Sequence, residues 1–132
     1  MELIRIADGN FGFGDYTLNE KSKLSDIPYQ GDLYKVKTFA EITKLEKNGA
    51  FLYESVPGTT VEKFKEDATG IAFMVEGTEG TQITLGLEEE TEYTVCVEEQ
   101  ELGVMATNVG GKLSISLDLE QGMPKKVAVK RV

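Results

Sequence analysis

The chain has 132 residues, of which 40% are hydrophobic and 28% charged, and its formal net charge is −9. This length suits one soluble folded domain, while an acidic surface repels phosphate groups and anionic lipid, so we expect neither nucleic acid nor a membrane as partner. The complete absence of histidine excludes an imidazole base, a histidine-ligated metal ion and a histidine pH switch.

The N-terminal half predicts strands separated by turns and loops. We expect strands at residues 3–6, 16–18 and 33–39, a turn at residues 8–10, and a loop at residues 19–31, which are rich in Asn, Ser, Asp, Pro and Gly. The glycine-rich residues 9–14 fit a strand or bulge in which Phe11 and Phe13 share one face. Residues 39–45 fit either a short helix or a strand, and the following Asn48-Gly49 favours a strand that enters a hairpin and returns at residues 51–53.

The C-terminal half alternates apolar and polar residues with period two. This pattern recurs at residues 71–76, 83–87, 93–98, 113–119 and 127–129. After the strand expected at residues 93–98, the chain has three more segments, near residues 102–106, 112–119 and 126–131. Strands half buried in a sheet have this period. We therefore predict an all-β fold, an immunoglobulin-like β-sandwich with at most one short helix, in a single domain over residues 1–132. A turn at residues 56–60 leaves open a division into residues 1–57 and 58–132.

One segment in this half has the pattern of a structural corner. Leu87 is followed by three glutamates and then by Thr91, Glu92 and Tyr93. This segment resembles the tyrosine corner of fibronectin type III and related immunoglobulin-like domains, although Glu89 stands where proline is usual. The resemblance implies that Leu87 and Tyr93 pack beneath an arch between two sheets, with the tyrosine hydroxyl bonded to an upstream backbone group.

The whole chain also resembles a family of short uncharacterised proteins from gut Clostridia, some of which bear the label endosialidase. Residues 31–39, 41–49, 53–59 and 110–114 carry this likeness. A sialidase holds its substrate carboxylate with three arginines, on a propeller several times longer than this chain. Because this chain has only Arg5 and Arg131, we expect no sialidase activity.

The remaining side chains suggest a binding protein more than an enzyme. We expect the acidic clusters at residues 88–90 and 98–101 to be solvated turns, residues 8–10 and 66–67 to be turns instead of calcium sites, and Cys96 to be a small, partly buried hydrophobic residue. Sugars stack on aromatic faces, so the candidate ligand-binding residues are tyrosines of the less regular half. These are Tyr16, Tyr29, Tyr34 and Tyr53.

The predicted function is a non-catalytic interaction or structural module without a cofactor or a metal ion. A carbohydrate-binding module is the alternative, and a small glycoside hydrolase is a distant third. The partners would be a protein, a second copy of the chain or a glycan. Lysines at positions 35, 37, 125, 126 and 130 could protect edge strands, and equally an unprotected edge could pair two chains across a two-fold axis. One thiol and no export signal predict a cytoplasmic location.

Overall fold

The computed structural model describes residues 1–132 and contains thirteen β-strands and no helix. The strands are β1 (Ile4–Ala7), β2 (Asn10–Phe13), β3 (Ser22–Tyr29), β4 (Asp32–Phe39), β5 (Ile42–Lys47), β6 (Ala50–Val56), β7 (Thr60–Asp67), β8 (Gly70–Glu76), β9 (Gly80–Gly86), β10 (Glu92–Val97), β11 (Gln100–Ala106), β12 (Lys112–Asp118) and β13 (Lys125–Arg131). With strands alone, the structure has no helix long and apolar enough to cross a bilayer.

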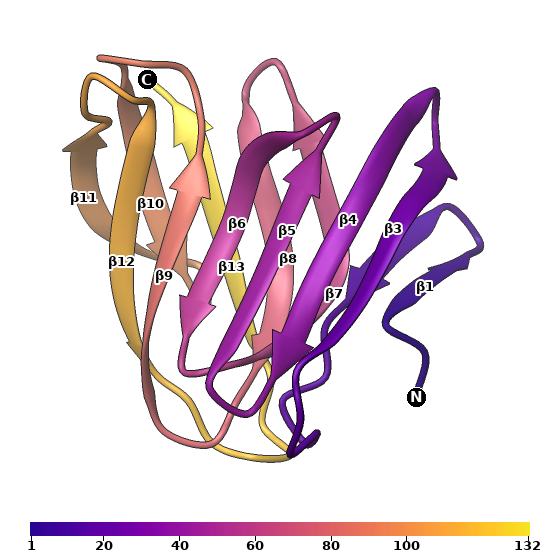
Figure 1. The fold of residues 1–132 in the computed structure, drawn as a ribbon. Helices are drawn as coiled ribbons and strands as arrows, with labels where there is room; N and C mark the ends of the chain where they lie inside the picture. The colour runs from indigo at the N-terminus through magenta and orange to yellow at the C-terminus, as the bar shows by residue number, and fades with distance from the viewer.

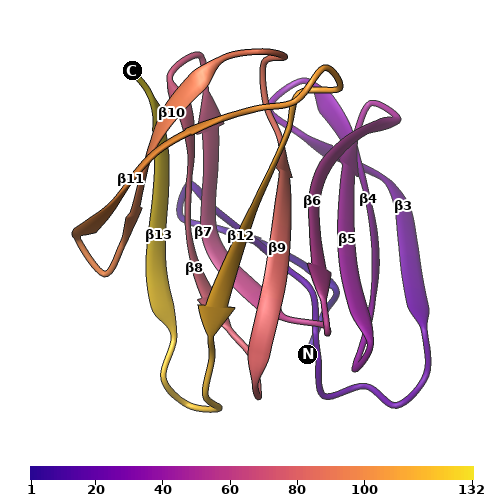
Figure 2. The same ribbon diagram turned by 90° about the vertical axis from the view of Figure 1, so that its left-hand side faces the viewer.

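The strands form two antiparallel sheets that lie face to face (Figures 1 and 2). The seven-stranded sheet has the order β1-β2-β7-β8-β13-β10-β11, and the six-stranded sheet has the order β12-β9-β6-β5-β4-β3. Each half of the chain contributes strands to both sheets, so a cut after residue 57 would divide both of them. The chain is therefore a single domain.

The core lies between the sheets and confirms the predicted all-β sandwich. It is one cluster of 23 buried residues drawn from both sheets. In β12 exposed and buried residues alternate strictly, as the sequence pattern predicted. Immunoglobulin domains have seven to nine strands, so this sandwich is larger and has its own strand order.

The hairpin from β5 to β6 forms where the sequence placed it. Asn48 and Gly49 have φ values of 51° and 80°, the left-handed conformation that a tight two-residue hairpin needs. Upstream, Phe39 and Ile42 are register partners at the turn between β4 and β5. The alternative short helix over residues 39–45 is therefore absent. The strand interpretation is confirmed for residues 42–45, while residues 40 and 41 form the turn between β4 and β5.

Two elements of the N-terminal half differ from the prediction. Residues 16–18 form a turn instead of a strand, because the Asp15 carboxylate accepts hydrogen bonds from the backbone N–H and the hydroxyl of Thr17 and so bends the chain. Most of the expected loop at residues 19–31 is the edge strand β3. This strand tolerates Pro28 because it pairs only with β4. The polar residues between Leu24 and Ile27 form a bulge and have no register partner on β4.

The lysines expected at sheet edges lie on interior strands. Lys35 and Lys37 belong to β4, which pairs with both β3 and β5. Lysines 125, 126 and 130 belong to β13, which pairs with both β8 and β10. The prediction that these lysines protect edges is therefore wrong, because alternation along a strand shows which face a residue occupies and not the position of the strand in the sheet.

The crossover from β9 to β10 carries the chain from one sheet to the other. Tyr93 is buried, and its hydroxyl accepts a hydrogen bond from the backbone N–H of Glu88 at 3.2 Å. Leu87 packs against the core cluster. The Thr107 hydroxyl donates to the Glu88 carbonyl at 2.6 Å and accepts from the Thr91 N–H at 2.9 Å. These bonds hold the crossover in one conformation.

Candidate ligand pocket

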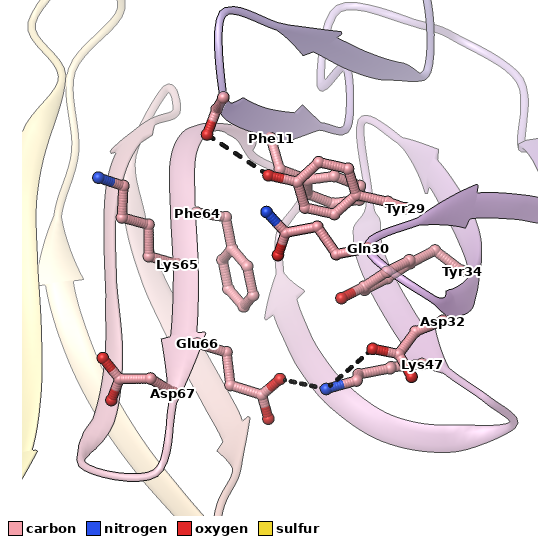
Figure 3. A pocket seen from close by; sticks show the side chains of 11 residues that line it. Phe11, Tyr29, Gln30, Asp32, Tyr34, Lys47, Phe64, Lys65, Glu66 and Asp67 are labelled. Atoms are coloured by element: carbon pink, nitrogen blue, oxygen red, sulfur yellow. Dashed lines mark hydrogen bonds and ion pairs between the residues drawn. The ribbon is translucent and has the colours of Figure 1, made fainter.

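A pocket opens between the two sheets at the end where the β3–β4 hairpin approaches β7 (Figure 3). Its volume is about 350 Å³, within the range of small-molecule sites. The lining combines aromatic rings with amide, carboxylate and ammonium groups. The residues are Gly9, Phe11, Tyr29, Gln30, Asp32, Tyr34, Lys47, Phe64, Lys65, Glu66 and Asp67.

The β3–β4 hairpin positions one wall of the pocket. Gln30 and Gly31 form its turn with φ values of 50° and 85°, so Tyr29 and Asp32 face each other as register partners. Tyr34 follows two residues later on the inward face of β4 and is the register partner of Lys47 on β5. Successive hairpin strands therefore bring together side chains that lie up to 18 residues apart in the sequence.

The opposite wall comes from β7 in the other sheet. A bulge between Glu62 and Lys65 interrupts the register of β7, and Lys63 within it has a φ value of 53°. Phe64 follows in this bulge and is buried against the core. Glu66 then lies two residues farther along the strand and faces the pocket (Figure 3).

Aromatic rings pack into a cluster along the hairpin side of the pocket. The ring centroid of Phe11 lies 4.9 Å from that of Tyr29 and 4.7 Å from that of Tyr34. The Tyr29 hydroxyl donates to the Gly9 carbonyl oxygen at 3.4 Å. Phe11 and Tyr34 are buried, whereas Tyr29 is half-buried and is the ring of this cluster most open to a ligand.

Ion pairs link the two walls. The ammonium nitrogen of Lys47 lies 2.8 Å from Glu66 Oε1 and 3.6 Å from Asp32 Oδ2. The hydrogen bond to Glu66 raises the pKa of Lys47 above its ordinary value and outweighs the opposing effect of burial. Lys47 is therefore fully charged in the folded protein and connects β5 to β7.

The Tyr34 side chain is buried for most of its length, but its hydroxyl faces the open pocket and is not itself a buried atom without a partner. The residue is only 8% exposed, its hydroxyl points into the pocket, and no hydrogen bond joins it to the protein (Figure 3). Burial raises the pKa of Tyr34 above its ordinary value of 10.0, so the hydroxyl is neutral and able to donate. Because the hydroxyl opens on the pocket, it is in reach of solvent, and a ligand in the pocket could take the place of water as its partner.

The structure brings together two of the four tyrosines proposed as ligand contacts. Tyr29 and Tyr34 line the pocket, with ring centroids 6.2 Å apart. Tyr53 is fully buried in the core and bonded to Thr59, so it is unavailable to a ligand. Tyr16 is buried elsewhere, with its hydroxyl 2.5 Å from Glu76 Oε2. The candidate site therefore keeps Tyr29 and Tyr34 and loses the other two.

Several pocket residues had no signal in the sequence. Phe11 was expected to share one face of a strand or bulge with Phe13, but nothing in the sequence indicated that Lys47, Phe64 and Glu66 would meet it. Asp67, considered with Glu66 as a calcium ligand, instead accepts hydrogen bonds from the N–H and hydroxyl of Thr69 in the β7–β8 turn. No group of three or more Cys, Asp and Glu side chains gathers as a metal ion would require.

Comparison of the chain with protein-family models, with curated proteins and with solved structures found no match. The resemblance to the Clostridia family stays a prediction.

Proposed function

We propose that this protein is a non-catalytic binding module that holds a neutral sugar unit in the pocket between the β3–β4 hairpin and β7. The observation that carries the proposal is the Tyr34 hydroxyl, which is neutral and directed into the open pocket without a hydrogen-bond partner in the protein. A ligand hydroxyl would accept its hydrogen bond in place of water.

The composition of the lining supports a sugar as the ligand class. A sugar ring has an apolar face and a rim of hydroxyl groups, so it suits a site that combines an aromatic ring with amide and carboxylate groups. Tyr29 provides the partly exposed ring, and Gln30 and Asp32 provide hydrogen-bonding groups beside it. Gln30 is exposed at the hairpin tip, where it can donate to one hydroxyl and accept from another.

The charge of the lining supports a neutral ligand over an acidic one. The pocket has three carboxylates, at Asp32, Glu66 and Asp67, against two ammonium groups, at Lys47 and Lys65. No arginine lines it. Arg5 is bonded instead to Glu62 and to the Val61 carbonyl oxygen, so the forked donors that recognise a sialic acid carboxylate are missing here.

The position of Lys47 supports binding without catalysis. Glycoside hydrolysis needs two carboxyl groups on either side of the scissile bond. Asp32 and Glu66 are the pair that could take these roles, but the Lys47 ammonium contacts both of them. The space between the two carboxylates, where a glycosidic oxygen would have to lie, is thus filled by the protein itself.

The proposal is tested with a panel of neutral mono- and oligosaccharides, measured by calorimetry and by thermal shift, and with the variant Tyr34→Phe. Because the hydroxyl has no protein partner, this variant should be as stable as the wild type. Its affinity for the sugar should fall roughly 2- to 10-fold, the effect of losing one hydrogen bond. Tyr16→Phe is the matched control, since it removes a tyrosine hydroxyl outside the pocket and should leave sugar affinity unchanged.

Two results would overturn the proposal. One is a panel in which no neutral sugar binds. The other is a sugar that binds Tyr34→Phe and wild type equally, since the pocket hydroxyl would then have no part in recognition.

A further inference from the structure

The four strands at the ends of the two sheets differ in how their free edges are protected. β1 has only four residues, β3 contains Pro28 and a bulge, and a bulge at Leu102 interrupts the pairing of β11 with β10. Shortness, proline and bulges are usual means by which a protein prevents an edge strand from pairing with another chain. β12 has none of them, because its seven residues all pair with β9 without a shift of register.

The backbone of β12 has free hydrogen-bonding groups along this edge, which lies on the left in Figure 1 and toward the viewer in Figure 2. Just before β12, the Gly111 carbonyl accepts from the N–H of Leu87, which follows β9, at 2.7 Å. Backbone groups of successive residues in an antiparallel strand point to opposite sides. Odd-numbered residues of β12 therefore bond to β9, while the N–H and C=O groups of Ser114 and Ser116 point away from it.

The chain itself closes one end of this edge. The Asn108 N–H donates to the Lys112 carbonyl at 3.1 Å, and the Asn108 side-chain oxygen accepts from the Lys112 N–H at 2.9 Å. Asn108 thus occupies the place where another strand would pair with Lys112. The open part of the edge begins at Leu113.

The sequence of the open edge reads the same in both directions. Residues 113–117 are Leu-Ser-Ile-Ser-Leu. When a second β12 runs antiparallel to the first with Ile115 opposite Ile115, each leucine lies opposite a leucine and Ser114 lies opposite Ser116. Residues opposite each other share one face of a sheet. The buried leucines and isoleucines of the two copies therefore continue the inner face, and the exposed serines continue the outer face.

We infer that β12 of one copy pairs with β12 of a second copy about a two-fold axis at Ile115. In this register Ser114 and Ser116 form the hydrogen-bonded pairs, as their free backbone groups require. The two six-stranded sheets join into one continuous sheet of twelve strands. A two-fold contact closes on itself, so the product is a dimer and not a filament. The pocket lies toward the other end of the sheet and stays open.

The charges beside the open edge support a second copy as the partner. Lys112 and Asp118 are exposed and belong to none of the salt bridges within the chain. Across the two-fold axis, Lys112 of one copy approaches Asp118 of the other, whereas a parallel second strand would bring like charges together. The Lys112 ammonium also lies 4.6 Å from the centroid of the Phe51 ring, so this exposed pair sets the strand direction more than the affinity.

The net charge of −9 repels two copies from each other, but this edge carries no net charge. β9 has no charged residue, and β12 has only Lys112 and Asp118. The remaining repulsion acts between distant groups and is screened by salt. The dimer should therefore be more stable at about 0.15 M salt, where the Debye length is about 8 Å, than at about 0.01 M, where it is about 30 Å.

The test is sedimentation equilibrium of the full chain at about 0.15 M salt and up to about 1 mM subunits, where the wild type should dimerise. Ser114→Lys/Ser116→Lys places lysine opposite lysine twice in the contact and should weaken dimerisation about tenfold or more. The matched control is Gln82→Lys/Thr84→Lys, because these residues are the register partners of Ser116 and Ser114 on the interior strand β9. It makes the same change in net charge and should dimerise more strongly than the β12 lysine variant.

A mixture of oppositely charged variants tests the register. Ser114→Glu/Ser116→Glu alone should also dimerise weakly, whereas its mixture with the lysine variant places glutamate opposite lysine and should restore the dimer. Far-UV circular dichroism checks that each variant is folded, and Ser116→Pro, which removes one free N–H of the edge, gives an uncharged variant with the same expected loss.

Three results would overturn the inference. The first is a wild type that stays monomeric up to about 1 mM, including one that instead binds an extended peptide. The second is a β12 lysine variant that dimerises as strongly as the β9 control. The third is a mixture of the lysine and glutamate variants that fails to associate.

Discussion

The substitution Thr59→Val should destabilise the sandwich strongly, because buried hydroxyl groups bind Thr59, in the connection from one sheet to the other, to the six-stranded sheet. Thr59 lies between β6 and β7 and is fully buried. Its hydroxyl oxygen lies 2.8 Å from the Tyr53 hydroxyl and 2.8 Å from Ser55 Oγ. Its backbone is also fixed, since Thr43 Oγ1 accepts from the Thr59 N–H at 3.0 Å and donates to the Thr59 carbonyl at 2.8 Å.

The magnitude follows from the groups that valine would leave without partners. Valine keeps the shape of threonine but not its oxygen, so the hydroxyls of Tyr53 and Ser55, both fully buried, each lose their hydrogen bond to position 59. An unsatisfied buried hydroxyl costs about 1–3 kcal/mol. Two of them predict a loss of about 2–6 kcal/mol, a large share of the roughly 5–15 kcal/mol that typically stabilises a domain.

Equilibrium unfolding in urea, followed by far-UV circular dichroism because the chain has no tryptophan, measures this loss. Thr84→Val is the matched control: the Thr84 hydroxyl has one bond to Ser114 Oγ, at 2.9 Å on the surface, and its loss should cost less than about 0.5 kcal/mol. The double variant Thr59→Val/Tyr53→Phe leaves one orphaned hydroxyl instead of two and should recover about 1–2 kcal/mol relative to Thr59→Val. Equal losses for Thr59→Val and Thr84→Val would refute the reasoning.

Two further predictions concern tyrosine hydroxyls. Tyr93→Phe should lower the free energy of unfolding by about 1 kcal/mol because the Glu88 N–H loses its acceptor; unchanged stability in a urea titration would show that the hydroxyl does not hold the crossover. Burial, together with the hydrogen bond and the negative charge of Glu76, raises the pKa of Tyr16 from 10.0 to about 12. The contribution of the neutral Tyr16 hydroxyl to stability is therefore complete below pH 10 and is lost as the pH rises from 10 to 12. Tyrosinate absorbance should therefore show a late phase that ionises well above pH 10, with unfolding accompanying it, whereas a titration completed in one phase near pH 10 would contradict this environment.

Much of the fold could be predicted from the sequence where one face of a strand is buried and the other is exposed. β12 shows this most clearly, since each apolar residue in it is buried and each polar residue is exposed. β3 was missed because it is an edge strand with Pro28 and a bulge, so its residues are mostly exposed and lack the period of two. Residues 16–18 were wrongly predicted because their period resembles a strand, whereas the Asp15 side chain bends the backbone locally.

Only the part of the candidate site that lies within one hairpin could be predicted from the sequence. Tyr29, Gln30 and Asp32 belong to one hairpin turn, so their proximity is a property of the sequence. Phe64 and Glu66 come from the other sheet, and their position depends on how the two sheets pack and on the bulge in β7. No local pattern encodes that packing, which is why the pair between Lys47 and Glu66 had no signal in the sequence.

The pocket can be tested without changing the outer surface of the sheet, because the two faces of β4 carry different side chains. In β4 Tyr34 and Val36 face the interior, while Lys35 and Lys37 face outward. Lys47, near the pocket, has two carboxylates within 4 Å, whereas Lys37 has none, so these lysines differ in role as well as in position. A substitution at Lys37 should therefore leave sugar binding intact, whereas Tyr34→Phe should weaken it.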